Sequence, residues 1–436
     1  MTTDEEIEKD HIHYHGVDKA EQHLGVREAL EIFLREIATT GTETIRTQSS
    51  NGRILASDVA SPTDLPRFSR STRDGYAIQL PADGEDGVSN LSLSVIGDVR
   101  IGTFSDLVVH YGESSKIATG AYIPQGANSV VMREYSKIAD GRLLITRPAR
   151  IGENILSPGE DLAKGQILLR SGTRLRPQHI ALLSLVGVPK IKVHKKPRVA
   201  VFSTGDELKD ASQMRQSGGK TKVTTAATFD ANRPFVFSMI DELGGIPIDL
   251  GIAGDHFKEI KSKMAVGLRR GDALVLSAGS SVGERDYVSR AAEAIPGLKM
   301  LIHGVAMRPS SPTGLAIYHG KPVIFLPGFP TSAIVSFFVF GLPAIERLSG
   351  SSATETAMIR ASMDEDFVGK SGLTHFLRVK VRREGQIYRA TIIRPTEAQY
   401  SSWLSVANGI AVIGGDGDAK VSKDEEVPVW LIGDVN

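Results

Sequence analysis

The 436-residue chain contains no cysteine, which excludes disulfide bonds, thiolate metal sites and a thiol nucleophile. A chain without thiols fits a reducing cytoplasm, and a cytoplasmic location is expected. The chain also lacks an excess of either charge, since Lys+Arg and Asp+Glu both number 51. Nucleic-acid binding needs a basic surface, so no nucleic-acid partner is expected.

An unbroken apolar run that could span a membrane is also missing. The most apolar stretch, residues 323–345, is interrupted by Pro327, Gly328 and Pro330. We interpret it as a buried strand followed by a buried helix. The first residues are acidic and polar and do not resemble a signal peptide, so no membrane association is expected.

Histidines are concentrated in residues 1–23, which we interpret as a polar leader. His11, His13, His15 and His23 form a tract that can bind a metal. We prefer the interpretation of a solvated segment whose histidines face water.

The remaining chain changes its pattern several times, as expected for about two to four domains. Residues 24–51 and 151–195 are predicted to form a connector with helices, and residues 52–150, with short β-rich runs between turns, an all-β module. Residues 196–350 alternate strands and helices, which predicts a mainly parallel sheet covered on both faces. Residues 354–436 return to short strands and are predicted to form a β-barrel. The expected fold is therefore multidomain α/β plus β.

Three predicted strands of the α/β region end in loops rich in glycine, serine and threonine. Open α/β sheets bind ligands at the carboxyl ends of their strands, and such loops offer N–H and hydroxyl donors to anions. The third loop, residues 326–332, also opens a helix. Ordinary turns remain the alternative for each loop taken alone. The substrate-binding candidates in these loops are Ser203, Thr204, Gly205, Gly279, Ser280, Ser281, Gly283 and Gly328.

Carboxylates follow the same strands. Asp206, Glu207, Asp230 and Asp286 can share a divalent cation, because Mg²⁺ prefers oxygen ligands and is often completed by substrate phosphates. For Asp230 the alternative is the N-cap of a helix beginning near Asn232. The Asp74-Gly75 and Gly159-Glu160-Asp161 segments are turn-like when taken alone.

Taken in order, these motifs resemble the MoeA / gephyrin E-domain family over residues 24–436. The segments that carry the resemblance are GRILASDVASPTDLPRFSRSTRDGYAI, ATGAYIPQGANSVVMRE, GENILSPGEDL, RVAVFSTGDEL, DANR, SAGSSVGERDY, LPGFPTSA and SVANGIAVI. The resemblance implies a MogA-like α/β core and an elongated homodimer. It also implies an active site between the α/β domain of one subunit and the β module of the other.

The resemblance also implies an activity and residue roles. The family are molybdopterin molybdenumtransferases, which insert molybdate or tungstate into adenylylated molybdopterin with a divalent cation such as Mg²⁺ and release AMP. A further expected partner is the adenylyltransferase of the same pathway. The positions that match the family's catalytic residues are Asp74, Thr119, Asp161, Glu207, Asp230 and Asp286, of which Glu207, Asp230 and Asp286 are the expected metal ligands. Pro327, Pro330 and Ser401 match or lie near positions that bind substrate.

The sequence departs from the family pattern in the anion-binding segment. The family's basic KPGKP is replaced by residues 308–312, in which Arg308 is the cation, Ser310 replaces a glycine and Ser311 replaces a lysine. Phe329 stands for an asparagine, Ala278 for a glycine, and Leu156 or a neighbour for an arginine. The serines can donate hydrogen bonds to an oxyanion but supply no charge.

Two other functions remain open. A MogA-like molybdopterin adenylyltransferase shares the α/β core but does not need the other domains. A degenerate paralogue that binds pterin, or a scaffold such as gephyrin, needs no catalysis. No Ser-His-Asp set is evident, so an oxygen of bound molybdate is the expected nucleophile.

Overall fold

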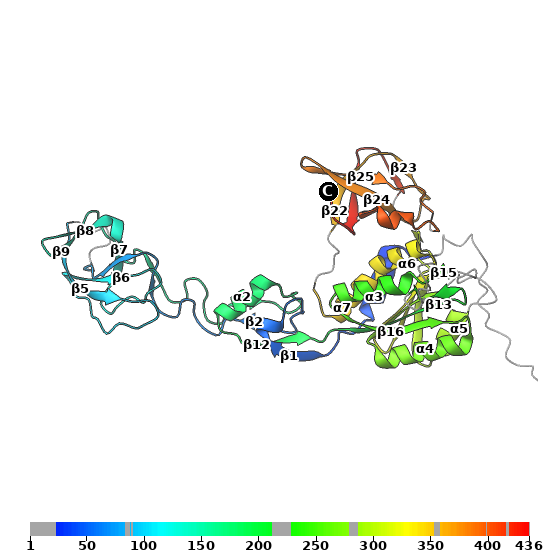
Figure 1. Ribbon diagram of the computed structural model, residues 1–436, viewed down its shortest axis with the longest axis horizontal. Helices are drawn as coiled ribbons and strands as arrows, with labels where there is room; N and C mark the ends of the chain where they lie inside the picture. The colour runs from blue at the N-terminus through cyan, green and yellow to red at the C-terminus, as the bar shows by residue number, and fades with distance from the viewer. Residues whose placement is uncertain are drawn as a thin grey trace, which may run out of the picture.

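The computed structural model describes residues 23–82, 88, 90–211, 228–278, 287–352, 358–397, 399–415 and 418–435. The molecule is elongated (Figure 1). A β-rich module lies at one end, a small connecting region lies in the middle, and the α/β core and a β-barrel lie at the other end.

The α/β core is built on a six-stranded sheet of order β16-β13-β17-β21-β20-β18. β16, β13, β17 and β21 are parallel to one another, whereas β20 is antiparallel to β21 and to β18. The strands are β13 (Arg198–Thr204), β16 (Ile246–Ala253), β17 (Ala273–Ala278), β18 (Leu298–His303), β20 (Gly314–Tyr318) and β21 (Lys321–Pro327). The predicted parallel-rich sheet is confirmed.

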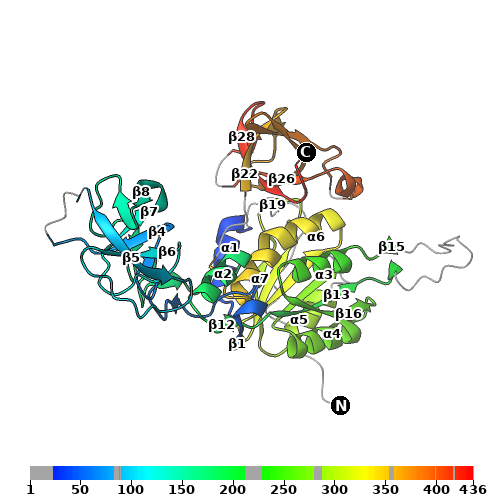
Figure 2. The same cartoon turned by 60° about the vertical axis from the view of Figure 1, so that its left-hand side comes forward.

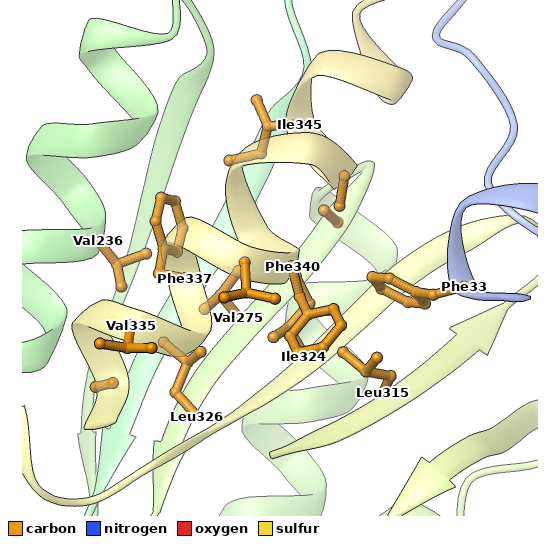
Figure 3. Close-up of a cluster of buried hydrophobic side chains, with 14 of the residues drawn as sticks. Phe33, Val236, Val275, Leu315, Ile324, Leu326, Val335, Phe337, Phe340 and Ile345 are labelled. Carbon is orange, nitrogen blue, oxygen red and sulfur yellow. The ribbon is translucent and has the colours of Figure 1, made fainter. Parts of the chain in front are cut away.

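Helices cover both faces of this sheet because its strands are apolar on both sides. Along β13, Val199 and Val201 enter one buried cluster, and Ala200 and Phe202 enter another. The first cluster includes residues of α3 (Asn232–Glu242), α6 (Pro330–Ser336), a π-helical segment (Phe337–Gly341) and α7 (Leu342–Leu348), and the second includes residues of α4 (Phe257–Arg270) and α5 (Tyr287–Glu293). Figure 3 shows part of the first cluster.

The amphipathic helix at the start of the described chain, α1 (Val26–Arg35), belongs to the α/β core by its packing. Phe33 is fully buried and points toward Leu315 and Phe340 (Figure 3). α1 lies beside α7 (Figure 2). The sequence grouped residues 24–51 with the connector, but the apolar side of α1 is covered by the core helices.

The connecting region combines two distant parts of the chain. β1 (Thr42–Arg46) pairs with β12 (Lys190–His194), and β2 (Val59–Ala60) pairs with β11 (Ile167–Leu169). Leu55 packs in the same cluster as Leu183 of the connector helix, so residues near 55–60 belong here by packing rather than to the β module. The helical elements of the region are a 3₁₀ turn (Thr47–Ser49) and α2 (Pro177–Leu185).

The β module is a six-stranded sheet of order β7-β4-β6-β5-β9-β8. Its strands are β4 (Gly75–Ile78), β5 (Ser92–Val99), β6 (Glu113–Ile117), β7 (Ser129–Met132), β8 (Ser136–Ala139) and β9 (Arg142–Ile145). A 3₁₀ turn (Arg133–Tyr135) follows β7, and β3 (Arg70–Ser71) pairs with β10 (Ile155–Leu156) at the junction with the connector.

The last domain is a closed barrel, as predicted. Its strands pair in the order β24-β25-β22-β28-β26, and β26 pairs with β24 to complete the circle. They are β22 (Met358–Met363), β24 (Thr374–Glu384), β25 (Ile387–Ile392), β26 (Gly409–Gly414) and β28 (Glu426–Leu431). The smaller elements are β19 (Met307–Arg308), β23 (Phe367–Val368), β27 (Lys420–Val421) and a 3₁₀ turn (Ser402–Ser405).

The most apolar segment is a buried core element. Its helical part, Pro330–Leu348, is long and apolar enough to cross a membrane, but 78% of it is buried inside the protein. This burial agrees with the sequence interpretation of a buried helix after a buried strand.

Candidate functional site

A cavity of about 970 Å³ lies at the carboxyl ends of β13, β17 and β21. This is the edge of an open α/β sheet at which ligands bind. The predicted site residues that line it are Thr204, Glu207, Asp230, Arg308, Ser310, Ser311, Pro327, Gly328 and Pro330. The barrel supplies Thr396, Glu397 and Gln399. The tertiary structure therefore brings to one cavity several segments that are spread between positions 204 and 399 of the sequence.

Asp230 is buried and already bonded to protein groups. Its Oδ1 accepts hydrogen bonds from Ser203 Oγ at 3.0 Å and from the N–H of Arg233 at 3.2 Å, and its Oδ2 accepts one from Arg233 Nε at 3.0 Å. The bond to an N–H three residues ahead resembles the capping role considered from the sequence, although the N-cap residue itself is Ala231.

Arg233 joins Asp230 to two further carboxylates. Its guanidinium pairs with Asp210 at 2.5 Å and with Asp249. Burial lowers the pKa of Arg233, but the bonded carboxylates outweigh burial and raise that pKa above its ordinary value. Arg233 and Asp230 thus form the buried ion pair, in which each charge compensates the other, while Asp249 is half exposed to solvent.

Glu207 is an exposed carboxylate on the α/β side of the cavity, and Glu397 is another on the barrel side. The backbone oxygen of Glu207 accepts a hydrogen bond from the N–H of Thr228 in β15 (Thr228–Phe229), which pairs with β14 (Leu208–Lys209). Its carboxylate lies against Gly205, where an added Cβ would stand 2.7 Å from both carboxylate oxygens. Gly205 has a φ of 150°, a conformation that side chains rarely adopt. A side chain at 205 would therefore strain the backbone and displace the Glu207 carboxylate.

The predicted metal-ligand set fits the structure only in part. Among the described residues, no group of three or more His, Cys, Asp or Glu side chains could hold a metal ion. Hydrogen bonds from Arg233 and Ser203 already use three of the roughly four acceptor sites of the Asp230 carboxylate. Glu207 faces the cavity, and Asp286 lies outside the described residues, as do Gly279, Ser280, Ser281 and Gly283.

The anion-binding segment carries one full cation at the cavity. Arg308 is exposed and is the one Lys or Arg among the described residues that line the cavity. Ser310 is buried, and its hydroxyl donates to the backbone oxygen of Ser332 at 2.7 Å. The expectation that Ser310 donates its hydroxyl to an oxyanion is therefore wrong, because that hydrogen is already used inside the protein.

Ser311 contacts the end of the leader. Its Oγ lies 3.3 Å from Nδ1 of His23, and His23 packs against Gly304. The interpretation of a solvated leader is thus wrong for His23, whose pKa is lowered by burial and by His303. His11, His13 and His15 lie outside the described residues.

The third loop connects the α/β core to the barrel. The hydroxyl of Thr331, at the start of α6, donates to the backbone oxygen of Tyr400 at 3.0 Å and accepts from Trp403 Nε1 at 2.8 Å. Ser401 lies between these two partners, at the start of a 3₁₀ turn. This contact places the segment around Ser401 beside the loop that contains Pro327 and Pro330.

Three predicted catalytic residues lie far from this cavity within one chain. Asp74 and Thr119 are in the β module, and Asp161 is in the connecting region, whereas the cavity is in the α/β core at the other end (Figure 1). Asp74 Oδ1 accepts hydrogen bonds from the N–H of Thr119 at 2.8 Å and from its hydroxyl at 3.1 Å. These bonds lower the pKa of Asp74. The Asp74 carboxylate is thus ionised, and with Thr119 it lies on the surface of the β module, apart from the cavity.

Comparison with known proteins relates the whole arrangement to one family. The family described as "MoeA N-terminal region (domain I and II)" matches residues 24–187, and "Probable molybdopterin binding domain" matches residues 200–347. A molybdopterin molybdenumtransferase of Staphylococcus aureus is 32% identical over 361 residues, which cover 82% of this chain and 83% of that protein. A Pyrococcus structure titled as a molybdopterin biosynthesis MoeA protein superposes with a TM-score of 0.78 at 31% identity, and covers 94% of this chain and 100% of that one.

The chain belongs to the MoeA family.

Within this MoeA protein, the sequence reasoning missed residues that support the cavity wall. Asn232 Nδ2 donates to the backbone oxygen of Gly328 at 2.8 Å, so the start of α3 supports the third loop. Arg233 and Ser277 were also not among the predicted site residues, although Ser277 begins the second strand-end loop. The DANR segment was a signal for Asn232 and Arg233, because a helix that begins directly after a strand-end carboxylate places its first side chains at the same edge of the sheet.

Proposed function

We propose that this MoeA protein is a molybdopterin molybdenumtransferase, which inserts molybdate or tungstate into adenylylated molybdopterin and releases AMP during molybdenum cofactor biosynthesis. The observation that carries the proposal is the strand-end cavity, whose wall combines Arg308, Glu207 and the loop at Gly328. A cytoplasmic location is part of the proposal, and it is supported by the absence of cysteine.

The residues at the cavity suit electrostatic catalysis. Arg308 supplies positive charge to an anionic phosphate or oxyanion, where a charge-assisted hydrogen bond is stronger than a neutral one. The hydroxyl of Ser310 is bonded to Ser332, so it is not free to attack. We therefore assign the attacking oxygen to bound molybdate rather than to a side chain. This oxygen would attack the adenylate phosphorus and displace the phosphate oxygen of molybdopterin; the Mo–O bond then breaks as molybdenum binds the sulfur atoms of the pterin, and AMP leaves with that oxygen. Mg²⁺ remains part of the proposal: Glu207, with Asp230 and Asp286 as predicted from the sequence, would hold it, and it would supply charge neutralisation at the phosphate.

We further propose that the working unit is a homodimer in which Asp74 and Thr119 of the opposite subunit complete the cavity. The support is geometric, because within one chain the β module lies far from the α/β core (Figure 1). The adenylyltransferase of the same pathway is the proposed source of the substrate.

The deciding experiment is the release of AMP from adenylylated molybdopterin by the purified protein with molybdate and Mg²⁺. Molybdate-dependent release of AMP supports the transferase. Formation of the adenylylated pterin from ATP instead identifies an adenylyltransferase. Binding of pterin without any release of AMP by the folded protein identifies a non-catalytic scaffold.

A further inference from the structure

Three buried polar side chains form a row of hydrogen bonds that reaches the cavity wall. Ser277 Oγ lies 3.0 Å from Ser203 Oγ, which lies 3.0 Å from Oδ1 of Asp230. Ser203 is 0% exposed, Ser277 5% and Asp230 7%. Both ends of the row line the cavity, Asp230 just before the start of α3 and Ser277 beside the end of β17, whereas Ser203 lies behind them.

The direction of this row follows from counting hydrogens. A hydroxyl has one hydrogen to donate, and an ionised carboxylate has none. Arg233 donates two hydrogen bonds to Asp230, which stabilises the ionised carboxylate. Ser203 must therefore donate its hydrogen to Asp230. The contact between the two hydroxyls then uses the hydrogen of Ser277, which points into the protein and leaves the Ser277 oxygen with lone pairs only.

We propose that Ser277 Oγ is a specificity-determining hydrogen-bond acceptor that binds a hydroxyl of the substrate's ribose and does not bind a phosphate or molybdate oxygen. The inference rests on the proposed function, which supplies a nucleotide. An oxyanion presents acceptor oxygens, so it finds no hydrogen at Ser277. The acceptor role of Ser277 differs from the donor role that the sequence predicts for serines of strand-end loops.

The position of Ser277 favours the sugar over the rest of the nucleotide. β17 is the direct neighbour of β21, so Ser277 lies about 4.8 Å, one strand spacing, from the strand that carries the Gly328 loop. In a nucleotide the ribose lies between the phosphate and the base. With the phosphate at the Gly328 loop and Arg308, a ribose hydroxyl is the donor that falls nearest to Ser277.

The test measures binding constants by calorimetry for wild type and Ser277→Ala, with AMP, 2′-deoxy-AMP, 3′-deoxy-AMP, IMP and molybdate as separate ligands. Ser277→Ala is expected to weaken AMP binding by about tenfold and to leave molybdate binding unchanged. The affinity of wild type for one of the two deoxy analogues should equal the affinity of Ser277→Ala for AMP. The affinity for that analogue should be the same in wild type and in Ser277→Ala. If IMP behaves in this way instead, the donor is the adenine amino group, which overturns the assignment to ribose.

Two further variants make the result specific. Thr228→Ala removes an exposed hydroxyl from the same cavity and should change neither affinity. The amide of Asp230→Asn can donate a hydrogen bond to Ser203 and so reverse the direction of the hydrogen bonds in the row. This variant should therefore weaken the binding of AMP and leave the binding of molybdate unchanged. Thermal melting checks that it is folded. Equal AMP affinity in wild type and Ser277→Ala, or an equal loss for AMP and molybdate, overturns the inference. A wild-type protein that binds neither ligand contradicts the proposed function itself.

Discussion

Arg233 binds Asp230 twice, since its N–H donates to Oδ1 over 3.2 Å and its Nε donates to Oδ2 over 3.0 Å. Their side chains are 8% and 2% exposed, so both charges are buried. Arg233→Met should destabilise the protein by about 3–5 kcal/mol, because it leaves a buried carboxylate without its partner. Urea denaturation measures the change.

A matched control for this prediction is Arg360→Ala. Arg360 pairs with Glu426, but the two side chains are 63% and 53% exposed. Exposed pairs contribute about 0–1 kcal/mol, so this variant should lose little stability. Similar losses in the free energy of unfolding in both variants would show that the buried ion pair stabilises the protein no more than an exposed one.

Gly205→Ala should reduce the turnover of the proposed reaction by displacing the Glu207 carboxylate. The added Cβ would stand 2.7 Å from both carboxylate oxygens. Gly244→Ala is the control, because Gly244 also has a positive φ of +79° but has no atom within 4 Å of the added Cβ. Both variants should lose about 1 kcal/mol of stability from backbone strain. Only Gly205→Ala should lose activity; equal turnover in the two variants would remove Glu207 from the site.

The single cation at the cavity predicts weak oxyanion binding. Arg308→Ala should abolish molybdate binding in calorimetry, since no other Lys or Arg among the described residues lines the cavity. Ser311→Lys should tighten it by about 1–2 kcal/mol, the usual gain from a hydrogen bond to a charged group. Unchanged affinity in Arg308→Ala would place the oxyanion elsewhere and leave residues 308–312 with a structural role.

The proposed dimer predicts complementation between two inactive chains. Asp74→Ala removes the β-module contribution, and Glu207→Ala removes the α/β contribution. A mixed dimer has one site with two intact halves, so it should recover about half of the wild-type activity. Mixed dimers isolated with two affinity tags give the measurement. A monomer in sedimentation, or no recovery in proven mixed dimers, would contradict the shared site.

The barrel contains a carboxylate that should make its stability depend on pH. Hydrogen bonds from Arg382, Thr391 and Arg389 hold the pKa of Asp364 well below its ordinary value. A lowered folded-state pKa stabilises the protein above the unfolded pKa of about 3.9, and that stability is lost as the pH falls further. Asp364→Asn should therefore be less stable than wild type at pH 7, with the difference shrinking below about pH 4. A difference that is constant with pH would argue against this ionisation.

The sequence was sufficient where a pattern is local. The alternation of strands and helices, with nearly continuous apolar strands, predicted the doubly covered sheet, because a strand such as β13 must bury both of its faces. Strand-end loops predicted the cavity edge, since parallel strands bring their carboxyl ends together. The ordered motifs were sufficient for the family, whose match covers most of the chain.

Tertiary structure decided which predicted groups are available. For Asp230 the sequence left a metal ligand and a helix cap open, and for Ser310 it predicted a donor to an oxyanion. The structure pairs Asp230 with Arg233 and Ser310 with Ser332, and such partners are set by packing rather than by spacing along the chain. The sequence predicted a solvated His23, but its side chain lies within hydrogen-bonding distance of Ser311, which is far away in the sequence. The hydrogen of Ser277 points inward only because Ser277 forms a row with Ser203 and Asp230. The sequence specifies which residue types lie at an edge of a sheet. The direction of a hydrogen bond depends on all neighbouring donors and acceptors, and the tertiary structure determines which residues those neighbours are.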